Sequence, residues 1–322
     1  MTEPFFQVDG LNTWFFTRQG VVKSVRDISF DLRRGEVLGI VGESGSGKSV
    51  TGMSIMGQID DPGRIVSGSI ALDGEELTAF TFEEMRRYRG RKIAMVFQNP
   101  LMTLNPLMRV RDQMYEAISE HEDISRKEMH DRCIEVLKAV GIPSPEERLD
   151  AYPHEMSGGM RQRVVIATAL LLGPDMIIAD EPTTALDVTI QAQIIYHIRR
   201  QIDERGLGMI WISHDLSTLS ELADRILVMY AGAMMEIGTT EDIIGSPRHP
   251  YTRKLLDSVP SRNTPGERLR QIPGNMPSLL SLAKGCPFAS RCERATEVCS
   301  EPVPATELSA THRIWCYHPF EG

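Results

Sequence analysis

The sequence predicts an α/β fold in which short buried strands bring polar residues to one edge of a sheet. Two segments support this prediction. The apolar run at residues 37–41 leads into a glycine-rich segment at residues 42–49, and a second apolar run at residues 176–179 ends in Asp180 and Glu181. Short apolar runs bounded by glycine or acidic residues are typical of strands buried on both faces. Helical patterns separate these runs along the chain, as expected for an alternating α/β fold.

The composition is that of a globular protein with an acidic balance. The chain has 322 residues, a formal net charge of -9 and a pI of about 5.5. This charge disfavours broad electrostatic binding to nucleic acid. No apolar stretch reaches the ~18 residues that span a bilayer, and the N-terminus lacks the basic and apolar regions of a secretory signal. We therefore expect a cytoplasmic protein that reaches a membrane only through other subunits.

Two antiparallel strands are expected ahead of the first buried strand. Residues 5–8 and 21–32 carry short, roughly alternating apolar patterns. Between them lie Trp14, Phe15 and Phe16. An exposed aromatic ring here is able to stack on a purine, and packing in the core of a strand is an equally open interpretation.

The glycine-rich segment has the pattern of a phosphate-binding loop. The P-loop pattern G-x-x-x-x-G-K-[ST] is matched by Gly42, Glu43, Ser44, Gly45, Ser46, Gly47, Lys48 and Ser49. Glycines let the backbone N–H groups converge on a phosphate chain, and the following helix adds the positive end of its dipole. We expect Lys48 to contact the β- and γ-phosphates and the Ser49 hydroxyl to coordinate Mg²⁺. The preceding strand and following helix favour nucleotide binding over a chance turn.

A helical insertion is predicted after a further buried strand. Residues 93–97 form this strand, which ends at Gln98. A polar side chain at that end is placed to reach Mg²⁺ or the attacking water, and the simpler alternative is a loop-capping amide. Residues 99–140 are helical in character, with Met129, Cys133 and Leu137 on one face, so Cys133 is interpreted as a core residue. We expect the insertion to carry contacts to partner proteins.

Two polar turns lead into helices in the second half of the chain. Ser157, Gly158 and Gly159 precede a helical run. They form either a second anion site or a plain N-cap. Residues 185–187, which end in Asp187, turn the chain into another helix.

Two strands of this half deliver candidate catalytic residues. Asp180 and Glu181 follow a buried strand, an arrangement in which Asp180 holds Mg²⁺ together with Ser49. Glu181 then orients and polarises the attacking water, as a general base or something close to it. His214 lies at the carboxyl end of the strand at residues 209–212, where it is placed to contact the γ-phosphate. The alternative is a structural role, which is the commoner one for a lone histidine.

Taken in order, these motifs resemble those of the ATP-binding cassette (ABC) ATPase family. The resemblance covers residues 5 to about 245, and its elements are GESGSGKS at Gly42, the Q-loop residue Gln98, the signature MSGGM at Met156, IIADE at Ile177, the D-loop ALD at Ala185 and ISHD at Ile212. It implies a P-loop NTPase fold of the ABC type, with an antiparallel β subdomain and a helical subdomain at about residues 99–157. Met156 and Met160 stand where members often have Leu and Gln. Because both only flank the phosphate-facing backbone, we expect function to survive.

The resemblance also implies a mechanism that the spacing alone does not. In ABC proteins, the P-loop of one subunit binds ATP, and the signature of another subunit caps it. The single cassette found here therefore implies a second ATPase subunit. The implied catalytic residues are Gln98, Glu181 and His214, and the implied Mg²⁺ ligands are Ser49, Gln98 and Asp180. Ser157, Gly158 and Gly159 would cap the ATP of the other subunit, and Asp187 would have the D-loop role. Phe15 would stack on the adenine, with Trp14 and Phe16 as alternatives.

Residues beyond the cassette resemble the oligopeptide/dipeptide permease branch of bacterial ABC importers. The resemblance is carried by residues 249–256 (HPYTRKLL), by Ile272-Pro273-Gly274 and by the cysteine-rich end, within an extension at residues 251–322 that follows a nucleotide-binding domain at 1–250. It implies an ATPase that powers uptake of di- or oligopeptides from the cytoplasmic face of the inner membrane. Its partners would be a second ATPase, commonly a paralogue, two membrane permease subunits docked at residues 99–150, and a periplasmic binding protein. Related systems carry nickel, glutathione or other small solutes.

The extension contains four of the five cysteines. Cys286, Cys292, Cys299 and Cys316 have the spacing C-x5-C-x6-C-x16-C. A reducing cytosol argues against disulfides, and the spacing lacks the paired C-x-x-C arms of zinc ribbons. Four thiolates on an irregular, proline-rich backbone are able to wrap one metal centre. Resemblance to dipeptide-type importer ATPases with a similar tail favours a [4Fe-4S] cluster, with Zn²⁺ or unligated thiols as alternatives.

A rival of a different class is a nucleic-acid-associated ABC ATPase with a zinc-binding tail. Repair ATPases of the chromosome-structural type need a long coiled coil, for which residues 99–150 are too short. Translation-type proteins carry two cassettes, unlike this chain. A binding module that has lost catalysis is disfavoured by the presence of Lys48, Asp180, Glu181 and His214. The transport ATPase is therefore the leading hypothesis.

Overall fold

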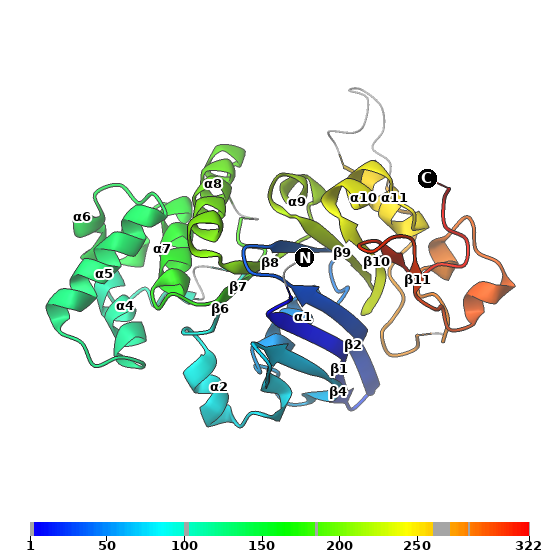
Figure 1. Cartoon of the computed structure of the whole chain (residues 1–322), viewed down its shortest axis with the longest axis horizontal. Helices are drawn as coiled ribbons and strands as arrows, with labels where there is room; N and C mark the ends of the chain where they lie inside the picture. Colours follow the sequence, from blue (N-terminus) through cyan, green and yellow to red (C-terminus); the bar gives the residue numbers. More distant parts are fainter. Residues whose placement is uncertain (1–2, 100–102, 184–185, 260–270, 283, 322) are drawn as a thin grey trace. The chain divides into compact units, whose positions relative to one another are not determined.

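The computed structural model describes residues 3–99, 103–183, 186–259, 271–282 and 284–321. The chain divides into two compact units. The first unit comprises Met1–Leu32, Val37–Ala79 and Trp211–Gly322, and the second comprises Arg33–Glu36 and Phe80–Ile210. Figure 1 labels most of the helices and strands of both units, and the boundary predicted near residue 250 falls inside the first unit.

An antiparallel sheet forms one part of the first unit. β1 (Phe6–Thr17) pairs with β2 (Gly20–Leu32) and with β4 (Gly63–Leu72), and β5 (Glu75–Glu76) adds a short edge strand. A 3-10 turn, η1 (Leu77–Ala79), follows. The two predicted antiparallel strands are thus confirmed, but β1 is longer than the pattern at residues 5–8 indicated. It continues through the aromatic residues 14–16 to the turn at residues 18–19.

A second sheet of the first unit contains the strand that precedes the P-loop. β3 (Val37–Val41) is buried throughout and runs parallel to β9 (Arg225–Tyr230). β10 (Ala233–Thr239) pairs antiparallel with β9, and the short strands β12 (Arg313–Ile314) and β11 (Thr306–Glu307) continue the sheet from β10. The C-terminal extension therefore adds strands to the sheet that holds the P-loop.

Helices pack beside these strands in the first unit, as Figure 1 shows for α9, α10 and α11. Gly39 makes close packing possible on β3, because a Cβ atom there would lie 2.9 Å from Leu219 Cδ2 and 3.2 Å from Ala223 Cβ. Leu219 belongs to α9, so the absence of a side chain at this position sets how close α9 approaches β3. The helices are α1 (Lys48–Ile55), α9 (Leu216–Leu222), α10 (Thr240–Gly245) and α11 (Pro250–Asp257).

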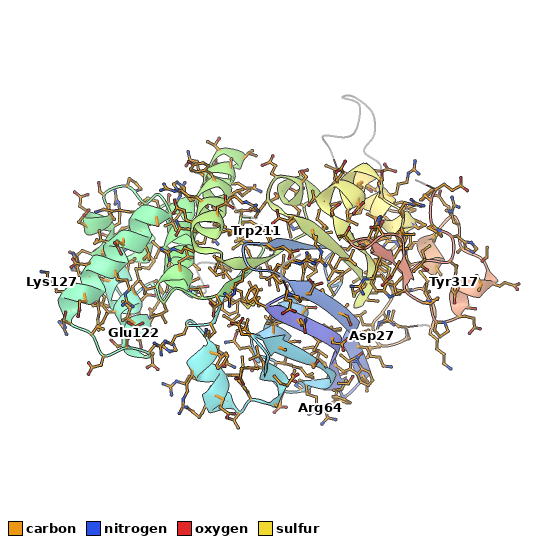
Figure 2. All side chains as sticks on the ribbon, viewed as in Figure 1. Asp27, Arg64, Glu122, Lys127, Trp211 and Tyr317 are labelled. Carbon is orange, nitrogen blue, oxygen red and sulfur yellow. The ribbon has the colours of Figure 1, made fainter. Side chains whose placement is uncertain are left out.

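The second unit combines two parallel strands with a group of helices. β6 (Ile93–Val96) pairs parallel with β7 (Met176–Asp180), so their carboxyl ends lie at the same edge. β8 (Gly208–Ser213) begins in this unit and ends in the first one, and its Trp211 is fully buried (Figure 2). The helices are α2 (Phe82–Tyr88), α4 (Val110–Ser119), α5 (Arg126–Ala139), α6 (Pro145–Leu149), α7 (Gly158–Leu170) and α8 (Val188–Arg205), with a 3-10 turn η2 (Pro153–Glu155).

The predicted helical insertion is confirmed over its described residues. Helices α4, α5 and α6 pack side by side (Figure 1), and Met129, Cys133 and Leu137 form part of the buried face of α5. Ser125 and Glu128 make a capping box at the start of α5. Cys133 is fully buried, and burial raises the pKa of its thiol to about 12, which is the behaviour of an inert core residue.

Candidate functional site

The P-loop connects β3 to α1 through a backbone that only glycine allows at two positions. A Cβ atom on Gly42 would lie 2.1 Å from the Met229 carbonyl oxygen, and one on Gly47 would lie 2.3 Å from the Ser24 carbonyl oxygen. Gly47 also adopts φ 100° as the N-cap of α1. Any larger residue at either position would displace the neighbouring backbone, so the glycines of the motif are required by packing and by conformation.

The Lys48 side chain is folded into the loop. It is 5% exposed, and its Nζ donates hydrogen bonds to the carbonyl oxygens of Gly42 at 2.8 Å and Glu43 at 3.0 Å. Ser46 Oγ accepts a longer bond at 3.5 Å. The ammonium group is thus held inside the curve of the P-loop, while Ser49 is half-buried at the start of α1. This is the arrangement of donors that suits a phosphate chain.

Two residues that the sequence did not assign to the site also contact the P-loop. Tyr251 Oη accepts a hydrogen bond from the Glu43 N–H at 2.9 Å, and burial raises the pKa of this tyrosine. Arg291 donates hydrogen bonds to both carboxylate oxygens of Glu43. They lie 208 and 248 residues from Glu43 along the chain, so no local pattern pointed to either contact.

The three candidate aromatic residues for adenine stacking lie in β1. Phe15 packs against Gly63, where a Cβ atom would lie 2.5 Å from its ring. Trp14 has the Lys23 ammonium 4.5 Å from its ring centre, and Phe16 has the Arg64 guanidinium at 4.3 Å. Since side chains alternate along a strand, Phe15 points to the opposite face from the other two. Its selection as the stacking residue stays a prediction.

The acidic residues lie at the carboxyl end of β7 in the second unit. Asp180 is 5% exposed and is the last residue of that strand. Glu181 follows with φ 45°, a left-handed conformation that is unusual for a residue with a side chain. Gln98 Nε2 donates a hydrogen bond to Glu181 Oε2 at 3.1 Å. The structure therefore brings together the Q-loop amide and the candidate general base, because β6 and β7 end at the same edge.

The remaining candidate motifs begin helices. Ser157 is the N-cap of α7, and its Oγ accepts the Met160 N–H at 3.2 Å. Ser157 and Gly158 are exposed, whereas a Cβ on Gly159 would lie 2.7 Å from Ile190 Cγ2 of α8. Asp187 caps α8 by accepting the Ile190 N–H at 3.0 Å. Ala185 of the predicted D-loop lies outside the described residues.

His214 follows the last residue of β8 in the first unit. Its side chain is exposed at the carboxyl end of the strand, as the sequence indicated. The next residue begins a helix, because Asp215 caps α9 by accepting the Ser217 N–H at 2.9 Å. This cap fixes the direction of the chain directly after His214.

The four cysteines of the extension are free thiols on irregular backbone of the first unit. The Cys286 N–H donates to the Cys299 carbonyl oxygen at 2.8 Å, and Cys316 Sγ accepts the His318 N–H at 3.3 Å. Burial is the main cause that raises the pKa values of Cys286 and Cys316 to about 11, and the neighbouring cysteines make a smaller contribution in the same direction. The thiols thus share one electrostatic environment. Within the described part of the chain, no group of three or more His, Cys, Asp or Glu residues is arranged to hold a metal ion.

Comparisons with known families match most of the chain. The family model of the ABC transporter matches residues 25–184, and the model of the oligopeptide/dipeptide transporter C-terminal region matches residues 235–299. The dipeptide transport ATP-binding protein DppD of Bacillus subtilis is 46% identical over 317 residues, covering 98% of this chain and 95% of the relative. The oligopeptide transport ATP-binding protein OppD of Escherichia coli is 45% identical over 319 residues, covering 99% and 94%.

Solved structures show the same fold. A dimeric post-hydrolysis state of the ATP-binding cassette MJ0796, bound to ADP and phosphate, superposes with a TM-score of 0.66 at 24% identity, covering 73% of this chain and 98% of that one. The cbiO1 subunit from Clostridium perfringens gives a TM-score of 0.65 at 25% identity, covering 76% and 92%. No helix among the residues described is long and apolar enough to cross a membrane.

Proposed function

Because the chain belongs to the ABC transporter family as an ATP-hydrolysing transport ATPase, we propose that it powers the import of di- and oligopeptides in bacteria. The observation that carries this proposal is the extent of the match. Relatives named for dipeptide and oligopeptide transport align over 98% and 99% of this chain, and the C-terminal region of that branch aligns at residues 235–299. These relatives favour peptides over nickel, glutathione or a nucleic-acid-associated role.

The residues of the P-loop fit the binding of ATP and Mg²⁺. Lys48 offers a buried ammonium for the β- and γ-phosphates, and the loop leads into the N-terminus of α1. The Ser49 hydroxyl, the Asp180 carboxylate and the Gln98 amide oxygen are the hard oxygen donors that Mg²⁺ prefers. When bound, Mg²⁺ would neutralise charge on the transferring phosphoryl group.

The proposed catalytic roles follow from the chemistry of the residues themselves. Glu181 would orient the attacking water and accept its proton, and the hydrogen bond from Gln98 would hold the carboxylate in place. His214 would contact the γ-phosphate from the end of β8. The left-handed backbone at Glu181 supports such a role, because strain of this kind gathers at functional sites.

A second ATPase subunit, most simply a paralogue, would complete each nucleotide site. The exposed N-terminus of α7, with Ser157 and Gly158, offers N–H groups and a helix dipole to a phosphate held by the partner. Asp187, at the start of α8, would also lie at the contact with the second ATPase subunit. The complex would include two membrane permease subunits and would lie at the cytoplasmic face of the inner membrane, supplied by a periplasmic binding protein.

The helical insertion is the proposed docking surface for the permease subunits. Leu107, just ahead of α4, is 85% exposed. Next to it along the chain, α4 and α5 line an open groove of about 600 Å³. Charged residues Arg111, Asp112 and Glu116 lie along the groove beside Tyr115. Such a mixture suits a short amphipathic segment of a membrane protein.

The four tail cysteines are proposed to hold a [4Fe-4S] cluster, for which the thiols would have to converge, because in this structure the described residues are not arranged as a metal site. Four thiolates are its usual ligands, and N–H donors to sulfur, such as that of His318 to Cys316, tune such centres. Zn²⁺ and unligated thiols are the alternatives. Protein purified without air should be brown and contain about four iron atoms per chain. Colourless protein with one zinc per chain, or with neither metal, would exclude the cluster.

Peptide import is tested by reconstitution. The Glu181→Gln variant should accumulate with bound ATP in the assembled complex, so it is suited to isolating the partners from membranes. The wild-type complex is then placed in lipid vesicles with its binding protein, and uptake of labelled di- and tripeptides is compared with uptake of nickel and glutathione. ATP-dependent uptake of peptides supports the proposal. ATP hydrolysis coupled only to nickel or glutathione uptake refutes it.

A further inference from the structure

Arg291 of the C-terminal extension is buried beside the P-loop. Its side chain is 5% exposed, and every nitrogen of its guanidinium donates a hydrogen bond. Nη1 donates to both Glu43 carboxylate oxygens at 3.0 and 2.9 Å and to Tyr230 Oη at 3.0 Å. Nη2 donates to the Ile272 carbonyl oxygen at 3.1 Å, and Nε donates to the Pro273 carbonyl oxygen at 2.8 Å.

This network holds Glu43 at three points. Its carboxylate accepts from Arg291, its N–H donates to Tyr251 Oη at 2.9 Å, and its carbonyl oxygen accepts from Lys48 at 3.0 Å. Glu43 is the second residue of the P-loop motif, directly beside backbone that must meet the phosphates. Anything that holds Glu43 in place therefore also holds the phosphate-binding backbone.

The same guanidinium fixes a second segment over the loop. We call residues 272–280 the strap. Arg291 holds the strap at the carbonyl oxygens of Ile272 and Pro273, and four residues later Met276 Cε lies 2.8 Å from the position of a Cβ on Gly45. Gly45 belongs to the P-loop, so Arg291 joins both the loop and the segment that covers it.

Aromatic rings also pack against this network. Tyr230, Tyr251 and Phe288 form a cluster with ring centres 4.7 to 5.3 Å apart. The Arg291 guanidinium lies 5.7 Å from the Tyr230 ring and 5.9 Å from that of Phe288. These contacts and the hydrogen bonds together restrict the orientation of the guanidinium, and a lysine cannot reproduce its planar fork of donors.

We propose that Arg291 is a positioning residue for ATP binding, which couples the conformation of the cysteine-bearing extension to the affinity of the P-loop. Two physical effects contribute. The guanidinium neutralises the Glu43 carboxylate, which would otherwise repel the anionic phosphates, and it orders the loop and the strap before ATP arrives. Arg291 is followed directly by Cys292. A movement of the extension at that cysteine would therefore displace the guanidinium that orders the loop and the strap.

The test is the affinity of purified full-length protein for a fluorescent ATP analogue with Mg²⁺. Arg291→Gln should weaken binding about tenfold, because the charge-assisted contact with the Glu43 carboxylate is lost, and should raise KM by a similar factor while kcat at saturating ATP changes less than about twofold. Arg291→Lys should give an intermediate loss, because it keeps the charge but not the fork. The Lys variant also keeps the test decisive if Arg291→Gln folds poorly.

A charge-removing second substitution separates positioning from general damage to the extension. In Arg291→Gln/Glu43→Gln, removing the unpaired carboxylate should recover part of the lost affinity, a non-additive result. The matched control is Arg294→Gln. Arg294 is exposed, lies in the same extension and contacts Phe320 and Pro319, so its variant should bind like wild type.

Three outcomes would overturn the proposal. They are unchanged affinity in both Arg291 variants, strictly additive losses in the double variant, and an equal loss in Arg294→Gln. The inference rests on nucleotide binding by this P-loop. A wild-type protein that binds no ATP would refute that function, whereas normal wild-type binding with unaffected Arg291 variants would refute only the role of Arg291.

Discussion

Burial of His249 predicts a loss of stability in mild acid. His249 is 1% exposed, and its Nδ1 accepts the Tyr251 N–H at 2.9 Å as the N-cap of α11. Desolvation lowers its pKa from 6.5 to about 4, although the Glu236 carboxylate, which accepts the His249 N–H at 3.0 Å, opposes this effect. The folded protein therefore keeps a neutral imidazole at a pH where the unfolded chain binds a proton.

The sign and size of the effect follow from this difference in bound protons. Between the two pKa values the unfolded state binds more protons, so stability rises with pH and falls as the pH is lowered through 6.5 towards 4. The linkage relation gives a loss of about 2 kcal/mol between pH 7 and about pH 5 from this one group. The Glu236 pKa is lowered, mainly by hydrogen bonds that outweigh its desolvation, so its contribution is lost only at lower pH.

The assay compares urea unfolding of wild type and His249→Asn at the two pH values. Asparagine keeps an N-cap acceptor for the Tyr251 N–H but does not titrate. The free energy of unfolding of wild type should fall by about 2 kcal/mol more than that of the variant. Parallel losses in the two proteins would show that His249 protonates as easily in the folded state as in the unfolded one, and the reasoning from burial would be wrong.

Three further predictions concern the nucleotide site. Glu181→Gln should keep ATP affinity while lowering kcat at least about a hundredfold; steady-state turnover and equilibrium binding check this, and wild-type turnover would move the base elsewhere. Lys48→Ala should weaken ATP binding about tenfold or more, because a buried charged donor to the phosphates is lost; titration with a fluorescent ATP analogue measures the change, and unchanged affinity would contradict the P-loop assignment. Gly47→Ala should abolish nucleotide binding and lower the unfolding temperature, because its Cβ would lie 2.3 Å from the Ser24 carbonyl oxygen; calorimetry of the apo protein together with the binding assay shows whether the loop tolerates the methyl group.

Local patterns were sufficient for the P-loop and for the acidic pair. Both follow short apolar runs, and a buried strand can be recognised from only a few consecutive residues. The caps of α2 and α5 are equally local, because Thr81 with Glu84 and Ser125 with Glu128 lie three residues apart. The length of β1 could not be predicted from local sequence. Its second half is stabilised by pairing with β2 and β4, and this pairing forms only in the folded sheet.

Contacts to the P-loop from distant parts of the chain could not be predicted from spacing. Tyr251 and Arg291 both reach Glu43, yet nothing within several residues of either one specifies a partner. No sequence pattern assigned Arg291 to the site. The proposed positioning role of Arg291 depends on its contacts with the strap and with the aromatic cluster around Tyr230, and tertiary packing brings these together.

The sequence by itself determined the chemistry of this protein: a phosphate-binding loop, an acidic pair after a strand, and a serine and glycines at the start of a helix. These depend on backbone conformations within a few residues, which local sequence specifies. Only the tertiary structure decided which residues support that chemistry, such as Arg291 on Glu43, Gln98 on Glu181 and Tyr251 on the P-loop. Hydrogen bonds between segments far apart in the chain form only when the fold brings the segments together. The residues next to each partner in the sequence therefore do not indicate that the bond will form.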